Sequence, residues 1–128
     1  MNMRLEINIL KEGYALALLP SGSPMPSWVS GPFTAVISSA EGITVVCPED
    51  NLPDGLKAQS GFRCLQIAGV FDLASVGVLA SVAQPLAAAG ISLFAYATWE
   101  TDYVLIQEEN LTPAISTLTE AGHAVRQR

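Results

Sequence analysis

A polar hairpin, Thr98 to Asp102 (TWETD), separates two strongly apolar stretches and carries side chains suited to binding a small molecule. Upstream, Asp72 stands where a helix N-cap belongs, so the stretch from Asp72 to Gly77 would offer free backbone N–H groups and the positive end of a helix dipole. Such a helix start favours a carboxylate, while Asp102 could hold an ammonium group. Together these groups predict a site for a zwitterionic amino acid.

The same residues also have a purely structural interpretation. Thr98 and Asp102 would then satisfy hydrogen bonds of the turn, and Trp99 would cover the edge of the core. Asp72 would be an ordinary N-cap. Residue spacing alone does not separate the two interpretations, so both stay open at this point.

No arrangement of side chains predicts catalysis. The single histidine, His123, stands at the start of the last predicted strand, where a solvated surface position is expected. Serine elbows, zinc spacings and phosphate-binding loops are absent from the sequence. Cys47 and Cys64 lie in apolar runs and form no Cys-x-x-Cys, which is typical of buried free thiols. We therefore expect a protein that is not an enzyme and that uses neither a metal nor a cofactor.

The composition excludes several classes of partner. Of the 128 residues, 50% are hydrophobic, which excludes a disordered chain. The formal net charge of −6 leaves no basic patch for nucleic acid. The amino terminus lacks the apolar run of a signal peptide, and polar residues, Pro and Gly interrupt the stretch from Leu73 to Ala97. We expect a cytoplasmic protein without membrane contact.

The elements that must position the hairpin are clearest in the second half of the chain. Alternation predicts a strand at 62–69, and apolar residues at helical spacing predict a helix from Asp72 to Gly90, with a kink or a broken last turn at Pro85. After this helix we predict two strands, at 91–98 and 103–108. They are followed by a helix at 110–122, capped by Asn110 and ended by Gly122, and by a last strand at 123–128. The order βαββαβ is the plan of a ferredoxin-like sandwich.

An internal repeat relates the two halves of the chain. A shift of 59 positions places Thr34–Leu52 over Leu93–Leu111 without a gap. Five pairs are identical: Glu41 with Glu100, Val45 with Val104, Glu49 with Glu108, Asn51 with Asn110, and Leu52 with Leu111. A duplication explains these matches better than chance. We expect residues 1–60 to form a degenerate half and residues 61–128 a complete domain.

The first half is expected to be rich in strands, at 4–10, 33–39 and 43–47. Four prolines in PSGSPMPSWVSGP prevent its first helix, and the turn that follows Leu52 shortens the second. Trp28 in this stretch is expected to be a lid over a neighbouring apolar face. Because such a half covers its sheet poorly, we expect it to pack against the second half or against a second chain.

The segments GPFTAVISSAEGITVVCPE, FRCLQIAG, SVGVLASVAQPLAAAGISLFAYAT and TDYVLI resemble a bacterial family of tandem ACT-like domains, over nearly the whole chain. The resemblance implies an α+β fold, a ferredoxin-like (ACT-like) βαββαβ sandwich in tandem whose first copy is degenerate and strand-rich. It also implies a regulatory role and assembly as a homodimer. The second half is similar to the ACT modules of the CASTOR arginine sensors, which implies a ligand between the helix start and the hairpin. That placement gives the ligand-binding residues Asp72, Ser75, Val76, Gly77, Thr98, Trp99 and Asp102, with Asp102 receiving the ammonium group.

The residue at one position argues against arginine as the ligand. The arginine sensor carries a glutamate near the helix start to receive the arginine side chain, whereas this chain has Ser75 there. A smaller or neutral amino acid fits these residues better. Two hypotheses follow, a non-enzymatic sensor that binds an amino acid, and a structural dimerisation or protein-interaction module without a small-molecule ligand.

Overall fold

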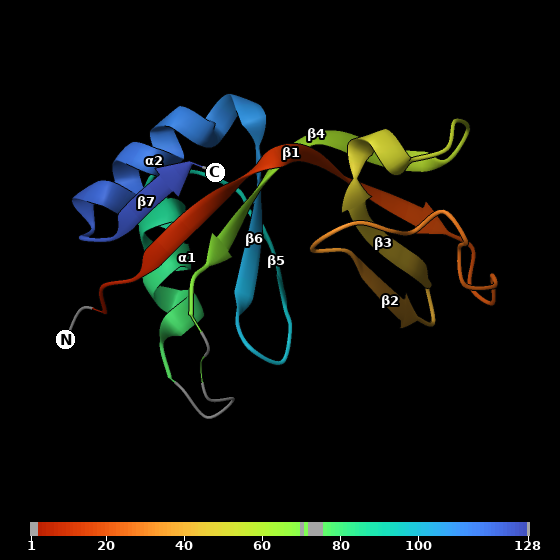
Figure 1. The fold of residues 1–128 in the computed structure, drawn as a ribbon, viewed down its shortest axis with the longest axis horizontal. Helices are drawn as coiled ribbons and strands as arrows, with labels where there is room; N and C mark the ends of the chain where they lie inside the picture. Colours follow the sequence, from red (N-terminus) through yellow and green to blue (C-terminus); the bar gives the residue numbers. More distant parts are fainter. Residues whose placement is uncertain (1–2, 70, 72–75, 128) are drawn as a thin grey trace. The chain divides into compact units, whose positions relative to one another are not determined.

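The computed structural model of the protein describes residues 3–69, 71 and 76–127. The chain forms two compact units, of which unit 1 comprises residues 1–11 and 63–128 and unit 2 comprises residues 12–62. Two long strands, β1 (Glu6–Leu19) and β4 (Lys57–Ile67), contribute residues to both units because each crosses a unit boundary. The elements are labelled in Figure 1.

Unit 1 is an α+β sandwich. Its elements after β4 are α1 (Val78–Ala88), β5 (Phe94–Ala97), β6 (Asp102–Gln107), the short 3-10 helix η2 (Glu108–Asn110), α2 (Leu111–Glu120) and β7 (Ala124–Gln127). Its strands follow the order β7-β1-β4-β6-β5, with β7 parallel to β1 and β5 antiparallel to β6. The predicted βαββαβ order and the ferredoxin-like class are therefore confirmed, with β1 added between β7 and β4.

The core of unit 1 lies between its sheet and its two helices (Figure 1). Alternate strand residues point to the face that carries the helices, and helix residues three or four positions apart point back at them. The buried residues of this core are Leu5, Ile7, Ile9, Leu65, Ile67, Val78, Val82, Leu86, Ile91, Val104, Ile106, Leu111, Ala114 and Leu118. Each fully buried side chain of this kind stabilises the fold by roughly 1.5–3 kcal/mol. This core therefore fixes both helices relative to the hairpin between β5 and β6.

Helix α1 begins later than the sequence predicts. Its first residue is Val78, and Gly77 precedes it with a φ of 86° in the left-handed region, which favours glycine. The Ser81 hydroxyl and backbone N–H both donate to the Gly77 carbonyl, at 2.7 and 3.0 Å. The predicted N-cap of this helix, Asp72, lies outside the described residues.

The end of α1 also differs from the prediction. The helix continues through Pro85 to Ala88, so the broken last turn, one of the two outcomes predicted at Pro85, does not occur. Gly90 ends the helix as predicted, because its φ of 75° turns the chain and the Ile91 N–H donates to the Leu86 carbonyl at 2.9 Å.

Helix α2 matches its predicted limits. Asn110 occupies the N-cap position without a side-chain capping hydrogen bond, which differs from the capping role predicted for it. Gly122 follows the helix with a φ of 102°, and the His123 N–H donates to the Leu118 carbonyl at 3.1 Å. This glycine turn leads the chain directly into β7.

Unit 2 consists of strands and turns in its described residues. The strands β2 (Ala35–Ser39), β3 (Gly42–Pro48) and the second part of β1 form antiparallel neighbours, and η1 (Glu49–Asn51) is its short helical turn. Strand β1 continues to Leu19, beyond the limit at residue 10 that the sequence predicts for the first strand. Trp28 packs against the buried cluster of Ala17, Ile43, Val45 and Cys47, which confirms the lid predicted for this residue.

Candidate functional site

The hairpin between β5 and β6 is closed by two threonines. The Thr98 N–H donates to the Thr101 carbonyl at 2.9 Å, and the Thr98 hydroxyl donates to the same carbonyl at 3.3 Å. The N–H groups of Glu100 and Thr101 in turn donate to Thr98 Oγ1, at 3.3 and 3.4 Å. Thr98 therefore makes the turn hydrogen bonds that the structural interpretation predicts for it.

The loop before α1 lies against this hairpin. The Phe71 N–H donates to the Glu100 carbonyl at 2.8 Å, and the Thr101 hydroxyl donates to the Ile67 carbonyl at 2.7 Å. The Thr101 bond is buried, and buried hydrogen bonds of this kind hold their partners in one geometry. The hairpin and the chain leading to α1 are therefore fixed side by side, as the sequence predicts.

The helix side of the candidate site is only partly described. Val76 is 86% exposed directly before α1, and Gly77 occupies the N-cap position. The first-turn N–H groups of α1 have no intrahelical acceptor and carry the positive end of the helix dipole. Asp72 and Ser75, which the sequence places on this side, lie outside the described residues.

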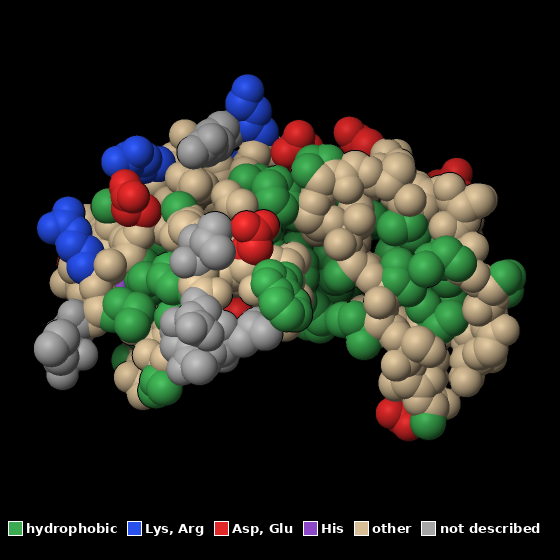
Figure 2. All heavy atoms as spheres, turned by 60° about the horizontal axis from the view of Figure 1, so that its bottom comes forward, with side chains coloured by type: hydrophobic (Ala, Val, Ile, Leu, Met, Phe, Trp, Pro, Cys, Tyr) green, Lys and Arg blue, Asp and Glu red, His purple; other side chains and the backbone are tan. Residues whose placement is uncertain are grey.

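The hairpin side presents an indole and a carboxylate. Trp99 is 79% exposed, so the prediction that it covers the edge of the core is wrong. Figure 2 shows that hydrophobic side chains reach the surface on the face in view. Asp102 is half-buried at the start of β6, and strand alternation places it on the same face as Val104, which belongs to the core beneath the helices. The Asp102 carboxylate therefore stands at the end of the helix-covered face.

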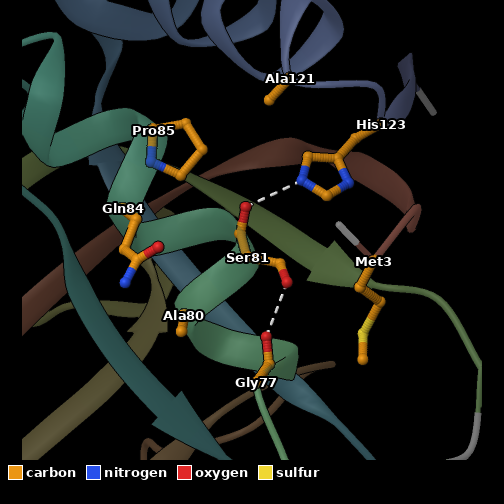
Figure 3. Close-up of a pocket in the computed structure, with 8 residues that line it drawn as sticks. All are labelled: Met3, Gly77, Ala80, Ser81, Gln84, Pro85, Ala121 and His123. Atoms are coloured by element: carbon orange, nitrogen blue, oxygen red, sulfur yellow. Dashed lines mark hydrogen bonds between the residues drawn. The ribbon is translucent and has the colours of Figure 1, made fainter. Parts of the chain in front are cut away.

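A separate cavity of about 510 Å³ lies beside α1 (Figure 3). Its lining residues come from the start of the chain, from α1 and from the turn after α2, and they are Met3, Gly77, Ala80, Ser81, Gln84, Pro85, Ala121 and His123. None of these residues carries a formal charge when the histidine is neutral. Among the described residues, Gly77 is the only one that the cavity shares with the site predicted from the sequence.

His123 is a buried connection between three elements. It is 5% exposed, so the solvated surface position predicted for it is wrong. The Leu5 N–H donates to His123 Nδ1 at 3.0 Å, and Nε2 lies 2.8 Å from the Ser81 carbonyl (Figure 3). Because a backbone N–H can only donate, Nδ1 accepts and Nε2 carries the proton that it donates to Ser81.

This histidine explains why α1 tolerates Pro85. In a helix the Ser81 carbonyl would accept from the N–H four residues later, but that residue is Pro85, which has no N–H. His123 Nε2 supplies the missing donor at 2.8 Å. The sequence carried a signal in the co-occurrence of one histidine and one mid-helix proline, but nothing local connected them.

The two cysteines are free, buried thiols, as predicted. Burial raises the pKa of Cys47, and burial raises the pKa of Cys64 to about 11 although the nearby Tyr96 hydroxyl, 3.7 Å from Cys64 Sγ, acts in the opposite direction. Thiols with a raised pKa are poor nucleophiles and poor metal ligands at neutral pH. No cluster of metal-ligating side chains occurs among the described residues.

The raised pKa of Cys64 predicts a loss of stability at alkaline pH. The unfolded thiol ionises first, so the folded form should lose stability as the pH rises from about 9 towards 11. The loss should amount to about 2 kcal/mol. Urea unfolding across this pH range should show a smaller decline in Cys64→Ala than in the unmodified protein. Equal declines in the two proteins would contradict the burial of this thiol.

No helix in the described part of the chain is long and apolar enough to cross a membrane. A family model described as an ACT domain matches residues 57–120, which is half of the 128 residues. No curated protein sequence matches the chain.

Solved structures resemble the chain over almost its full length. A protein of Agobacterium tumefaciens is 27% identical with a TM-score of 0.93, over 98% of this chain and 95% of that one. A protein of unknown function from Vibrio cholerae, described as a possible transport protein, is 22% identical with a TM-score of 0.75, over 92% and 90% of the two chains. The regulatory subunit of aspartate kinase from Thermus flavus is 12% identical with a TM-score of 0.66, over 93% and 99%. At these low identities the last two likenesses show the fold alone.

Proposed function

Because the chain belongs to the ACT-domain family, we propose that it is a non-enzymatic regulatory protein that senses a small ligand, an amino acid, at the end of unit 1. The ligand site lies between the loop before α1 and the hairpin of residues 98–102. Binding changes the assembly or the partner contacts of the protein, because a ligand transmits a signal only when it favours one conformation.

One observation carries this proposal. The Phe71 N–H donates to the Glu100 carbonyl at 2.8 Å, so the two segments that would hold the ligand already lie side by side. The hairpin side offers the half-buried carboxylate of Asp102 to an ammonium group, and the α1 start offers N–H groups to a carboxylate. These two groups match the two ends of an amino acid.

The solved structures support a regulatory role. Regulatory subunits of aspartate kinase share the fold over nearly the whole chain, and those proteins are named for regulation rather than for catalysis. At 12% and 15% identity they support the fold and leave the ligand open. We propose a neutral or small amino acid, because Ser75 stands where an arginine sensor would carry a glutamate.

The proposal also covers the location, the assembly and the domain division of the protein, on the basis of the same family. We propose a cytoplasmic homodimer. Each chain consists of two related halves, of which residues 1–60 are a degenerate copy and residues 61–128 are the complete domain. The proposed function involves no catalytic residue, cofactor, nucleic acid or membrane. Asp72, Ser75, Val76, Gly77, Thr98, Trp99 and Asp102 are the proposed ligand-binding residues.

A second candidate function is a structural dimerisation or interaction module without a small-molecule ligand. The exposure of large apolar side chains favours it, since Val76 and Trp99 are 86% and 79% exposed. The two functions differ in their response to amino acids, which a single experiment separates.

A thermal unfolding screen against the twenty standard amino acids tests the proposal. A ligand at a hundred times its Kd stabilises the folded state by about 2.7 kcal/mol. For a chain of this size that corresponds to a rise in Tm of roughly 10 °C. At least one amino acid at millimolar concentration should raise the Tm by several degrees, in a concentration-dependent manner. A panel without any shift would leave the interaction module as the function.

A further inference from the structure

The cavity beside α1 has the size of a small-molecule site and is distinct from the proposed amino-acid site. Its volume of about 510 Å³ falls within the range of roughly 300–1,000 Å³ that is usual for ligand pockets. Its walls come from the chain before β1, from the first part of α1 and from the turn that joins α2 to β7. All three segments belong to unit 1, and the hairpin of residues 98–102 does not line the cavity.

Hydrogen bonds hold the walls of this cavity in one arrangement. His123 accepts from the Leu5 N–H at 3.0 Å and donates to the Ser81 carbonyl at 2.8 Å. Figure 3 shows the Ser81 hydroxyl directed at the Gly77 carbonyl, 2.7 Å away. These bonds join all three segments, so the cavity is formed before any ligand arrives. Such preorganisation lowers the conformational cost of binding.

Small side chains keep the cavity open. Ala80 lies in α1 and Ala121 directly follows α2, so the two methyl groups line the cavity from different elements. Both residues have helical or near-helical backbone, which leucine adopts as readily as alanine. A leucine at either position would fill part of the space and gain the van der Waals contacts that an open space forfeits. The sequence therefore leaves unfilled a space that a common substitution would close.

The described lining of the cavity offers no charge to a ligand. His123 is its only titratable residue, and because Nδ1 accepts a hydrogen bond the ring is uncharged. Both ring nitrogens are engaged, so neither is available to a ligand. A charged molecule would lose part of its solvation in this cavity without gaining a countercharge. The lining therefore selects against phosphates, carboxylates and ammonium groups, and so against amino acids.

Gln84 supplies the polar group that the lining leaves available. It is exposed on α1 and makes no hydrogen bond within the described part of the chain. Its side-chain amide carries two donor hydrogens and an acceptor oxygen, a pattern that another amide or a lactam complements. The apolar part of the lining consists of Met3, Ala80, Pro85 and Ala121. Together these groups match an amide-like head on an apolar body.

We infer that the cavity beside α1 is a second ligand site, which takes an uncharged small molecule with an amide or lactam group on an apolar body. The Gln84 amide exchanges hydrogen bonds with that group, and the apolar body lies against Pro85 and Ala121. This site goes beyond the proposed function, because it differs from the amino-acid site in position and in the charge of its ligand. A ligand that bridges the three segments stabilises the folded unit.

Proton–nitrogen correlation NMR spectra of the full chain test the site with neutral probes and their charged counterparts. Benzamide and δ-valerolactam at millimolar concentration should shift the backbone resonances of Ala80, Ser81, Gln84 and Ala121 in a saturable manner. Benzoate and benzylammonium, which keep the ring of benzamide and add a charge, should leave these resonances unchanged. Equal shifts with the charged probes, shifts spread over the whole chain, or no shift at all would contradict the inference.

Substitutions within the cavity test the location of the bound probe. Ala80→Leu and Ala121→Leu fill the cavity from different segments, so each should weaken benzamide binding roughly tenfold or more while keeping or raising the urea midpoint. Gln84→Met keeps the length of the side chain and removes its amide, so it should weaken binding roughly three- to tenfold. Ala87→Leu is the matched control, because Ala87 is exposed on α1 and does not line the cavity. It should leave the affinity for benzamide unchanged.

Two results with these variants would overturn the inference. Benzamide binding that survives both leucine substitutions would place the probe outside the cavity, and full affinity in Gln84→Met would remove the amide from the site. If one leucine variant failed to fold, the other variant and the shifts in the unmodified protein would still decide the outcome. An amino-acid panel without any thermal shift would contradict the proposed function and leave this second site unaffected.

Discussion

Replacing His123 with alanine is expected to lower the free energy of unfolding by about 2–4 kcal/mol. The substitution leaves two backbone groups without their partner, the Leu5 N–H that donates to Nδ1 and the Ser81 carbonyl that accepts from Nε2. Each buried polar group left unpaired costs about 1–3 kcal/mol. Urea denaturation followed by circular dichroism measures the change.

A double-mutant cycle with Pro85→Ala isolates the role of the histidine. Alanine at position 85 restores a backbone N–H that can donate to the Ser81 carbonyl, so one of the two orphaned groups regains a partner. His123→Ala should therefore cost less stability in the Pro85→Ala background than in the unmodified protein. Strictly additive costs would show that His123 does not compensate for Pro85.

Gly42→Ala is expected to destabilise the protein by about 3 kcal/mol. Gly42 has a φ of 150°, a conformation that residues with a side chain rarely adopt. A Cβ atom at this position would also lie 2.8 Å from the Leu19 carbonyl oxygen of the neighbouring strand. The substitution therefore adds a backbone clash to a backbone strain, and thermal unfolding should show a large fall in Tm.

Gly55→Ala is the matched control for this prediction. Gly55 has a φ of 88°, and a Cβ atom there would meet nothing within 4 Å. Its replacement should cost only the strain of a left-handed conformation, about 1 kcal/mol. If the two variants lost equal stability, the close approach of β1 and β3 at Gly42 would not be the cause.

The hairpins and helices of unit 1 were predictable because local patterns determine them. Alternating apolar residues define β6, and glycines in the left-handed region end both α1 and α2. The start of α1 was not predictable, because Gly77 interrupts a stretch whose apolar spacing continues through it. Propensity cannot tell a glycine inside a helix from a glycine that precedes one.

The connections of His123 could not be predicted, because both of its partners are distant in the sequence. Its hydrogen bond to Leu5 spans 118 positions and its contact with Ser81 spans 42. Local pattern placed this residue near the start of a strand, where exposure is the usual outcome. In the folded chain the residue is buried instead, because the Leu5 N–H needs an acceptor, which is Nδ1, and the Ser81 carbonyl needs a donor, which is Nε2.

The candidate site was predictable in outline and not in its assignment of roles. Sequence placed Thr98, Trp99 and Asp102 in one polar hairpin opposite the chain that leads to α1. It could not show that the Thr98 hydroxyl is used by the turn while the Trp99 indole remains in solvent. Those roles depend on which backbone groups the loop geometry leaves free.

Strand β1 makes unit 1 depend on both ends of the chain. Its residues Glu6–Ile9 pair with Ala124–Gln127, so the sheet of unit 1 is complete only when two segments that are distant in the sequence have met. Contacts of such sequence separation slow folding, because a long loop must close before they form. The family match begins at residue 57, so a fragment cut at that limit would lack the strand between β7 and β4. The unit that carries the proposed site is thus contiguous in space, although its strands come from distant parts of the sequence.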